Sequence, residues 1–348
     1  MDLDVQRLVE FDFLRATEIA ALNCMQWMGK GNKEEADAAA CDAIRGMFDI
    51  TDICGEVVIG EGIKDEAPGI FKGEKLGRWR NGAPRFDIAL DPIDGTTNFS
   101  KGMPNSISCI AAATPDDNGQ SGLQEIPAFY MKKLAYPLEV RKAWMADPTL
   151  PISVATPLGE VIRITADILN KKVRDVVVMI LDRPRNEPYI EQVRLAGASL
   201  RMIADGDISA ALAPALRHSN IDLYAGIGGA PEAVLAAAAL RCLGGGMQAQ
   251  IWPRDDAERR SLIEIGWEDR LDTIYRSRDL ARGNDILFTA TGISDSPLLK
   301  GVEVHGATAV THSVLMRSRS GTVRYLNSEH NLLKKTIHLH SSANEVRI

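Results

Sequence analysis

The stretch VRDVVVMILDRPRNEPYIEQVRLAG, residues 173–197, joins a β-branched apolar run to a helical pattern. Its first nine residues predict a buried strand, and the helix expected over 189–195 ends where Gly197 follows. Two similar units come next, with strands expected at 200–203 and 221–225 and a helix after each. Strands that alternate with helices are typical of βαβ units, so the sequence predicts the α/β class with a largely parallel sheet.

The loops that follow these strands carry a set of charged residues and glycines. Because the carboxyl ends of parallel strands meet at one edge of a sheet, we expect these residues to converge on one crevice, the usual ligand position. The residues concerned are Arg183, Arg185, Asp205, Asp207, Gly229 and Glu232. Glu232 also follows Pro231 in a first helical turn, where the helix dipole favours a carboxylate whether or not it binds a metal.

The pattern changes on both sides of this segment. Upstream, helices are expected at 16–28 and 33–48, and strands at 56–59 and 86–90. Beyond Asp285 the sequence is rich in strand patterns, so we expect an antiparallel portion to complete the sheet system. We place a domain boundary near residue 165, which gives an N-terminal half over 1–165 and a C-terminal half over 166–348.

Composition excludes several classes of protein. The chain has 348 residues, of which 45% are hydrophobic, so it can bury a large core. A net charge of −7 without a Lys/Arg block argues against nucleic acid as a partner. The apolar stretch 230–243 is shorter than the roughly 20 residues that cross a bilayer, and predicts a buried helix. With an acidic N-terminus that lacks a signal-peptide pattern, we expect a cytoplasmic protein with no membrane partner.

The five cysteines are scattered and never form a CxxC pair. This arrangement indicates neither a disulfide framework nor a zinc ribbon, so we expect reduced thiols.

The segment FDIALDPIDGTTNF, residues 86–99, carries the most specific chemical signal. Asp91 ends an apolar strand, Pro92 turns the chain, and Asp94 follows just before an expected helix start at Gly95-Thr96-Thr97. Two carboxylates at this spacing can chelate a hard cation, and the free N–H groups of the helix start can hold a phosphate. An isolated Asp-Pro-x-Asp-Gly run would be a simple turn, but the buried strand and the two threonines favour the metal and phosphate interpretation.

The donor types select the cation and the reaction. Glu61 ends another strand, between two glycines, and adds a further carboxylate, while none of the six histidines lies near these motifs. Oxygen donors favour Mg²⁺ or Mn²⁺ over zinc. Two such ions about 4 Å apart can activate a water and stabilise a leaving alkoxide, which predicts hydrolysis of a phosphate monoester. A dianionic substrate also needs cations, for which Arg183 and Arg185, and less strongly Lys132 and Lys133, are candidates.

Seven motifs occur in a fixed order over most of the chain: GEGIKDEAPGIFKGEKLG, DIALDPIDGTTN, YMKKL, DRPR, ADGD, GIGGAPE and ATGI. Together they resemble class II fructose-1,6-bisphosphatases, a group that includes the cyanobacterial fructose-1,6-/sedoheptulose-1,7-bisphosphatases. The resemblance implies the layered αβαβα sugar-phosphatase fold of the lithium-sensitive phosphatase superfamily, Mg²⁺ or Mn²⁺ as cofactor, and a homo-oligomer, dimer or tetramer. It implies metal-dependent hydrolysis of the 1-phosphate of fructose 1,6-bisphosphate in gluconeogenesis or the Calvin cycle, with sedoheptulose 1,7-bisphosphate as a second substrate.

The resemblance also assigns roles to residues. The metal ligands that it implies are Asp37, Glu61, Asp91, Asp94 and Glu232. The catalytic residues are Thr96, which helps to align the attacking water, with Asp37 and Glu61. The substrate contacts are Asp94, Gly95, Thr96, Tyr130, Arg183, Pro184, Arg185, Asp205, Gly206, Asp207 and Gly229. The half over 1–165 would then bind metal and phosphate, and the half over 166–348 would supply sugar-phosphate contacts and one ligand. From its own context alone, Asp37 would be a surface charge.

The sequence departs from the family pattern in two places. Ile63 and Lys64 follow Glu61 and Gly62 where the family carries an acidic residue, so the number of cation sites stays open. Asp94 stands where the family usually has glutamate, and DPIDGTTNF is typical of inositol monophosphatases. An inositol-type monophosphatase and a non-catalytic sensor of a sugar phosphate or nucleotide therefore remain alternatives. GIGGAP also resembles a dinucleotide-binding turn, but Pro231 interrupts that fingerprint.

Overall fold

The computed structural model describes residues 6–60, 69–115, 119–342 and 344–347. The chain divides into two compact units, which we call unit 1 (Met1–Leu123 with Arg282–Ile348) and unit 2 (Gln124–Ala281). Unit 2 is a continuous segment that is inserted between the two segments of unit 1. The boundary expected near residue 165 lies inside helix α5 (Leu158–Ile168) of unit 2, and the last part of the chain returns to unit 1.

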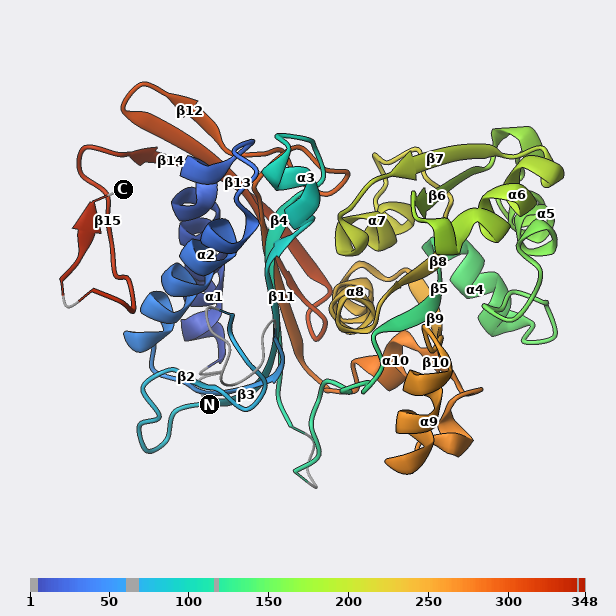
Figure 1. Ribbon diagram of the computed structural model, residues 1–348, viewed down its shortest axis with the longest axis horizontal. Helices are drawn as coiled ribbons and strands as arrows, with labels where there is room; N and C mark the ends of the chain where they lie inside the picture. The colour runs from blue at the N-terminus through green and yellow to red at the C-terminus, as the bar shows by residue number, and fades with distance from the viewer. Residues whose placement is uncertain (1–5, 61–68, 116–118, 343, 348) are drawn as a thin grey trace. The chain divides into compact units, whose positions relative to one another are not determined.

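Unit 1 is built on a mixed sheet with the strand order β12-β13-β11-β4-β3-β1-β2, and β14 pairs with β13 (Figure 1). The strands are β1 (Cys54–Ile59), β2 (Lys75–Leu76), β3 (Arg85–Asp94), β4 (Ile107–Ala113), β11 (Ile286–Gly292), β12 (Glu303–His305), β13 (Thr308–Arg317) and β14 (Thr322–Asn331). Among the described strands of this sheet, β1 and β3 are the only pair that runs in parallel. Since β11 pairs with β4 along its whole length, the antiparallel portion expected beyond Asp285 completes the sheet of the first part of the chain. A separate two-stranded sheet joins β15 (Thr336–Ile337) to β16 (Val346–Arg347).

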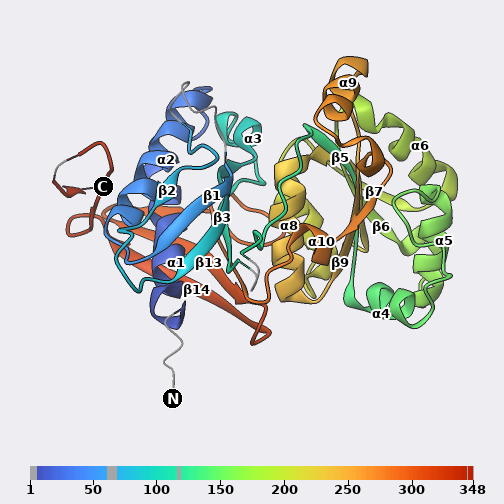
Figure 2. The ribbon, with the colours of Figure 1, turned by 90° about the horizontal axis from the view of Figure 1, so that it is seen from below.

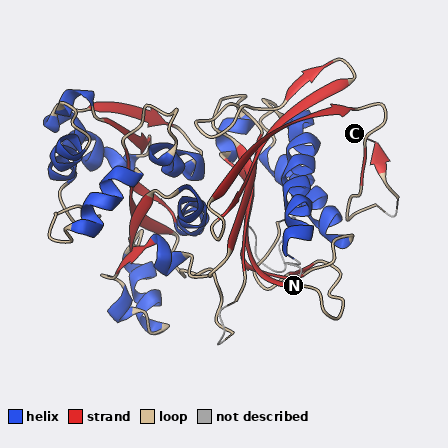
Figure 3. Ribbon diagram, turned by 180° about the vertical axis from the view of Figure 1, so that it is seen from behind, coloured by secondary structure: helices blue, strands red, loops and turns tan. Residues whose placement is uncertain are grey.

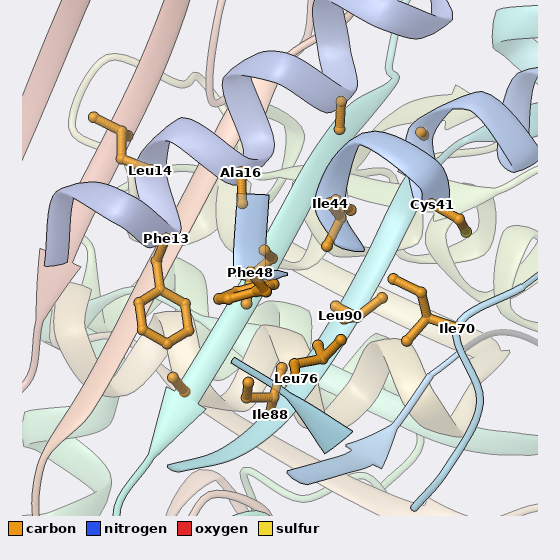
Figure 4. Packing of buried hydrophobic residues seen from close by; sticks show 14 of the residues in the cluster. Phe13, Leu14, Ala16, Cys41, Ile44, Phe48, Ile70, Leu76, Ile88 and Leu90 are labelled. Carbon is orange, nitrogen blue, oxygen red and sulfur yellow. The ribbon is translucent and has the colours of Figure 1, made fainter. Parts of the chain in front are cut away.

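Two long helices cover one face of this sheet (Figure 3). Helix α1 (Gln6–Cys24) packs on β4, β11 and β13, and on α2 (Lys33–Asp49), which also contacts β3. Phe13 of α1 meets Phe48 of α2 edge-on, with ring centroids 5.2 Å apart, and Phe86 of β3 at 5.4 Å. Figure 4 shows Phe13 and Phe48 among the other buried side chains of this core. Such T-shaped contacts add to the stabilisation that burial of the rings provides.

The first helix begins ten residues before the position that the sequence pattern indicates, and it ends at Cys24, where the 3₁₀ turn η1 (Met25–Trp27) follows. Two buried acidic residues, Glu10 and Glu18, interrupt its apolar pattern. Glu10 pairs with Arg317, and Glu18 accepts a hydrogen bond from the Ser328 hydroxyl. Because these partners come from distant strands, the local pattern could not reveal that the two carboxylates face the core.

Unit 2 is built on a six-stranded sheet in the order β10-β9-β5-β8-β6-β7. Its strands are β5 (Tyr130–Tyr136), β6 (Val177–Leu181), β7 (Ser199–Ile203), β8 (Leu223–Gly229), β9 (Gly246–Ile251) and β10 (Ile274–Arg276). β6 pairs in parallel with β7 and β8, whereas β5 is antiparallel to both β8 and β9. The four strands β6 to β9 therefore run in one direction, as βαβ units require. The expectation of a largely parallel sheet is nevertheless wrong for the pairing, because β5 and β10 run the opposite way.

Helices lie on both faces of the unit 2 sheet (Figure 2). One face carries α8 (Ala230–Leu243) and α10 (Ser277–Leu280), and the other carries α4 (Leu138–Ala146), α5 and α6 (Glu187–Ala196). Helix α7 (Asp207–Leu212) packs against α8, and α9 (Asp256–Glu264) follows β9. The short 3₁₀ turns are η2 (Val173–Asp175), η3 (Pro184–Asn186), η4 (Ala213–Ala215) and η5 (Glu268–Arg270).

Several local expectations are confirmed in unit 2. Helix α8 is buried, begins with Pro231 in its first turn, and ends at Gly244, which has a φ of 90°. Helix α6 ends at Gly197 in the left-handed region, as the sequence predicts. No helix in the described ranges is long and apolar enough to span a bilayer. All five cysteines are free thiols and buried.

Candidate active site

In unit 1 the predicted metal and phosphate segment forms the end of β3. The strand was expected to end at residue 90, but it continues to Asp94, and its register with β4 shifts between Asp91 and Asp94. Asp91 Oδ1 accepts a hydrogen bond from the N–H of Ile93 at 3.0 Å, and the Thr96 hydroxyl donates to the Ile93 carbonyl at 2.9 Å. The two aspartates are only 5% and 4% exposed. The segment therefore holds two buried carboxylates in a tight local turn.

Gly95 links these carboxylates to helix α3 (Thr96–Ser100), and the expected helix start is confirmed. Its φ is +89°, which L side chains rarely adopt, and a β-carbon there would lie 2.2 Å from the carbonyl oxygen of Asn105. The hydroxyl of Ser106 donates to the Gly95 carbonyl at 2.9 Å. The segment 105–106 thus fixes the backbone from which the Thr96 side chain projects.

Asp37 lies on α2 and is not the solvated surface charge that its local context indicates. Its Oδ1 atom is buried and has no hydrogen-bond partner among the described residues. Burial raises the pKa of the Asp37 carboxyl to about 7, against an opposing effect of Lys33. Lys33 also donates to the Thr97 hydroxyl at 2.8 Å, so this end of α2 contacts α3. A buried carboxylate oxygen without a donor is suited to a cation.

The other expected groups of unit 1 lie outside the described residues. These are Glu61, Ile63 and Lys64, which follow the end of β1. Within the described ranges, no three His, Cys, Asp or Glu side chains form a group that could hold a metal ion. Asp37, Asp91 and Asp94 supply carboxylate oxygens only, and this donor chemistry fits Mg²⁺ or Mn²⁺ rather than a soft metal.

In unit 2 the predicted substrate residues come to one edge of the sheet. Leu181 of β6 pairs with Ile203 of β7, so the loops that begin after these two strands leave from neighbouring positions. The antiparallel strand β5 begins at this same edge, because Tyr130 pairs with Gly229 at the end of β8. The edge therefore collects the loop after β6, the loop after β7, the end of β8 and the beginning of β5.

The two arginines of the β6 loop are held in different ways. Arg183 forms an ion pair with Asp205 at 3.4 Å, and both side chains are partly exposed. Arg185 lies over the Tyr130 ring, 4.3 Å from its centroid, and donates to the Ile227 carbonyl at 3.1 Å. Pro184 begins the η3 turn between them. Guanidinium groups in fixed positions suit the recognition of phosphate.

Asn186, which sequence reasoning missed, joins this loop to β8. Its side chain is fully buried, donates to the carbonyls of Leu181 at 3.0 Å and Ile227 at 3.3 Å, and accepts from the Ile227 N–H at 2.7 Å. The amide thus connects the two strands beyond the point where their backbone pairing ends. No local pattern indicates this role, because a single asparagine after an arginine pair is typical of any loop.

Lys133, a weaker candidate for binding the anionic substrate, is buried beside a carboxylate. It is 1% exposed, and its Nζ lies 2.7 Å from Asp207 Oδ2. Asp207 further accepts hydrogen bonds from the Gly229 N–H at 3.0 Å and, through Oδ1, from the Tyr224 hydroxyl. Tyr224 was not expected at the site. An aromatic residue at an internal strand position gives no local indication that its hydroxyl reaches a carboxylate.

Glu232 stands in the first turn of α8, close to this buried pair. Its Oε2 atom is buried and has no hydrogen-bond partner in the part of the chain that the structure describes. Burial raises the pKa of the Glu232 carboxyl, the charge of Lys133 lowers it, and Asp207 raises it. A β-carbon on Gly229 would lie 1.8 Å from Glu232 Oε2, and one on Gly228 would lie 2.0 Å from Asp207 Oδ2. These glycines make room for two carboxylates. Because the carboxylates would repel the pyrophosphate of a dinucleotide, the site argues against GIGGAP as a dinucleotide-binding turn.

The two units therefore carry buried carboxylates and strand-edge arginines, the groups that a metal-dependent phosphatase uses. A family model described as bacterial fructose-1,6-bisphosphatase, glpX-encoded, matches residues 7–330, and the chain belongs to this family. The resemblance that the motifs indicated is thus confirmed.

Two relatives illustrate the similarity. The fructose-1,6-bisphosphatase class 2 of Haemophilus influenzae is 38% identical over 339 residues, which cover 94% of this chain and 97% of that protein. The D-fructose 1,6-bisphosphatase class 2/sedoheptulose 1,7-bisphosphatase of Synechococcus elongatus is 34% identical over 348 residues, with the same coverage.

Proposed function

We propose that this protein hydrolyses the 1-phosphate of fructose 1,6-bisphosphate with a metal-activated water. The observation that carries the proposal is the family match over residues 7–330. Sedoheptulose 1,7-bisphosphate is the second substrate that we propose, because the name of the Synechococcus relative includes it. The buried carboxylates at the end of β3 agree with this chemistry.

The cofactor that we propose is Mg²⁺ or Mn²⁺. The proposed ligands are Asp37, Glu61, Asp91, Asp94 and Glu232. Among the described residues, Asp37 Oδ1 and Glu232 Oε2 are buried carboxylate oxygens without a hydrogen-bond partner, which supports two members of this set. When bound, the cation supplies activation of the attacking water and stabilisation of the leaving oxygen.

The side chains of the protein then have separate tasks. Thr96, held by the Ile93 carbonyl, orients the attacking water together with Asp37 and Glu61. Asp94, Gly95 and Thr96 bind the reacting phosphate, for which the backbone N–H groups after Asp94 provide donors. The turn of Arg183, Pro184 and Arg185 is cationic and holds the substrate. The Tyr130 ring packs against the guanidinium of Arg185. The loop over 205–207 and Gly229 complete the substrate contacts.

Family membership also supports proposals about the context of the protein. We place it in the cytoplasm, in gluconeogenesis or the Calvin cycle, as a homo-oligomer, a dimer or a tetramer. Two mixed sheets with helices on their faces are compatible with the layered αβαβα fold of the lithium-sensitive phosphatase superfamily. A sugar bisphosphate is the partner that we propose.

The test is release of inorganic phosphate from fructose 1,6-bisphosphate, sedoheptulose 1,7-bisphosphate and inositol 1-phosphate, each with Mg²⁺, Mn²⁺ or EDTA. We expect metal-dependent release from the bisphosphates and none with EDTA. The variant Asp91→Asn should lose turnover and keep its fold, whereas Glu56→Gln, at an exposed carboxylate of the neighbouring strand β1, should keep both.

The other outcomes identify the alternatives. Release from inositol 1-phosphate alone would favour the inositol-type monophosphatase that DPIDGTTNF suggests. Binding of fructose 1,6-bisphosphate without release in any metal would favour a non-catalytic sensor. Full activity of Asp91→Asn would contradict the metal assignment.

A further inference from the structure

The Tyr130 ring lies at the beginning of β5, between two strands that support it unequally. On β8 its cross-strand partner is Gly229, which has no side chain. On the other side, the Tyr130 carbonyl accepts a hydrogen bond at 3.0 Å from the N–H of Trp252, the residue that follows β9. The Trp252 ring meets the Tyr130 ring edge-on, with centroids 6.2 Å apart and planes at 61°. Of these two cross-strand neighbours, Trp252 is therefore the one that can hold the ring.

The orientation of the Tyr130 ring matters because Arg185 stacks on it. The guanidinium carbon lies 4.3 Å from the ring centroid, and Nε donates to the Ile227 carbonyl at 3.1 Å. A guanidinium is planar and carries its N–H donors in a rigid fork. A tilt of the ring beneath it would therefore change the direction in which the fork points.

Glu258 of α9 fixes the backbone on both sides of the aromatic pair. Its side chain is buried, with Oε1 accepting from the Phe129 N–H at 2.8 Å and Oε2 from the Arg254 N–H at 2.8 Å. Phe129 directly precedes Tyr130, and Arg254 comes two residues after Trp252. One carboxylate thus joins the beginning of β5 to the segment after β9 and keeps the two rings opposite each other.

We propose that Trp252 is a positioning residue for substrate binding, which holds the Tyr130 ring and through it the guanidinium of Arg185. The effect on affinity rests on the proposed function, whereas the packing of the rings follows from the contacts alone. Because Trp252 acts through residues that bind the substrate, its loss should weaken affinity and spare the chemical step.

The experiment compares Trp252→Ala, Trp252→Phe, Tyr130→Ala and the double variant Trp252→Ala with Tyr130→Ala. Trp267→Ala is the matched control, because Trp267 also packs against an arginine, with the Arg270 guanidinium 4.7 Å from its ring, but follows α9. Two measurements are made on each full-length variant: kcat and KM for fructose 1,6-bisphosphate, and the midpoint of urea unfolding. If Trp252→Ala folds poorly, Trp252→Leu replaces it.

We expect Trp252→Ala to raise KM about tenfold, which corresponds to the loss of one aromatic pair, with kcat within about threefold of the parent. Trp252→Leu should act in the same direction. Trp252→Phe should keep KM within about threefold, because a phenyl ring preserves the edge contact. In the Tyr130→Ala background, Trp252→Ala should change KM less than about twofold. The shift of the urea midpoint in the double variant should be smaller than the sum of the two single shifts, because each ring supports the other.

Different failures separate this proposal from the proposed function. An unchanged KM in Trp252→Ala, or an equal rise in Trp267→Ala, would overturn the positioning role. A full tenfold effect on top of Tyr130→Ala, or a Trp252→Phe variant as impaired as Trp252→Ala, would make the indole a direct substrate contact and overturn it as well. If the parent protein releases no phosphate from any bisphosphate, the proposed function fails, and the urea midpoints still decide whether Trp252 holds Tyr130: additive shifts would show that it does not.

Discussion

The Cα of Gly95 faces the carbonyl oxygen of Asn105 so closely that a β-carbon would lie 2.2 Å from it. The left-handed φ of +89° adds a second obstacle to any side chain. We expect Gly95→Ala to lower the free energy of unfolding by about 3 kcal/mol or more and to reduce kcat about 100-fold, because the backbone before Thr96 must move. Urea unfolding and phosphate release measure the two effects.

Gly82→Ala is the control for this prediction. Gly82 has a similar φ of +84°, but apart from its chain neighbours no atom of the described residues lies within 4 Å of its β-carbon position. Gly82→Ala should lower the free energy of unfolding by about 1–2 kcal/mol, the cost of a left-handed backbone conformation for an L residue. It should leave kcat unchanged. Equal losses of stability in the two variants would show that the contact with Asn105 is not what requires glycine.

The lowered pKa of His330 predicts how the stability of the fold depends on pH. Burial lowers its pKa, the nearby charge of Lys335 lowers it further, and Glu18 opposes both. The unfolded chain therefore binds more protons than the folded one near and below pH 6.5, so stability should fall as the pH drops through this range. We expect the parent protein to lose more stability than His330→Gln between pH 7.5 and pH 5 in urea unfolding. Parallel pH profiles for the two proteins would contradict this origin.

Arg317 sits between Glu10 and Asp285 in unit 1, and all three side chains are at most 10% exposed. The substitution Arg317→Met leaves two carboxylates buried without a counterion. It should lower the free energy of unfolding by about 3–5 kcal/mol. Arg80→Met removes an exposed ion pair with Asp52 and should change stability little. Thermal unfolding of both variants at equal protein concentration tests the difference.

The contacts of Arg185 lead to a prediction about substrate affinity. Its guanidinium stacks on Tyr130 and donates to the Ile227 carbonyl, and lysine can reproduce neither contact in full. Arg185→Lys should raise KM for fructose 1,6-bisphosphate about tenfold with a smaller change in kcat. Arg194→Lys, at an exposed position on α6, serves as the control and should leave both constants unchanged. A tenfold effect in both variants would mean that general charge, not the β6 loop, sets the affinity.

Local patterns were sufficient for those parts of the fold that depend on neighbouring residues. The strand at β7 and the ends of α6 and α8 were predictable because Gly197, Gly244 and Pro231 act through their own backbone conformations. The strand direction of β6, β7 and β8 also followed from their alternation with helices. The insertion of β5 between β8 and β9 could not be predicted, because it depends on pairing between segments distant in the chain.

In the candidate site, too, some residues could be predicted from their neighbours in the sequence and others depend on distant segments. Asp91, Asp94 and Thr96 lie within one short motif, and their sequence alone indicated a compact acidic turn. In unit 2, Lys133 and Tyr224 are linked to the predicted substrate residues through Asp207, which accepts a hydrogen bond from each. Their own neighbours in the chain are ordinary strand residues. Asp37 became a candidate only through family resemblance, since its burial depends on how α2 packs.

The insertion of unit 2 has a consequence for biosynthesis. Strand β4 is buried at every position, and its partner β11 is translated only after all of unit 2 has been made. During that interval the nascent chain presents an apolar, unpaired strand edge, the kind of surface that promotes aggregation or recruits a chaperone. Unit 2, being continuous, can finish folding on the ribosome first. A transcript truncated before Ile286 would therefore yield a folded unit 2 attached to an unfinished, aggregation-prone unit 1.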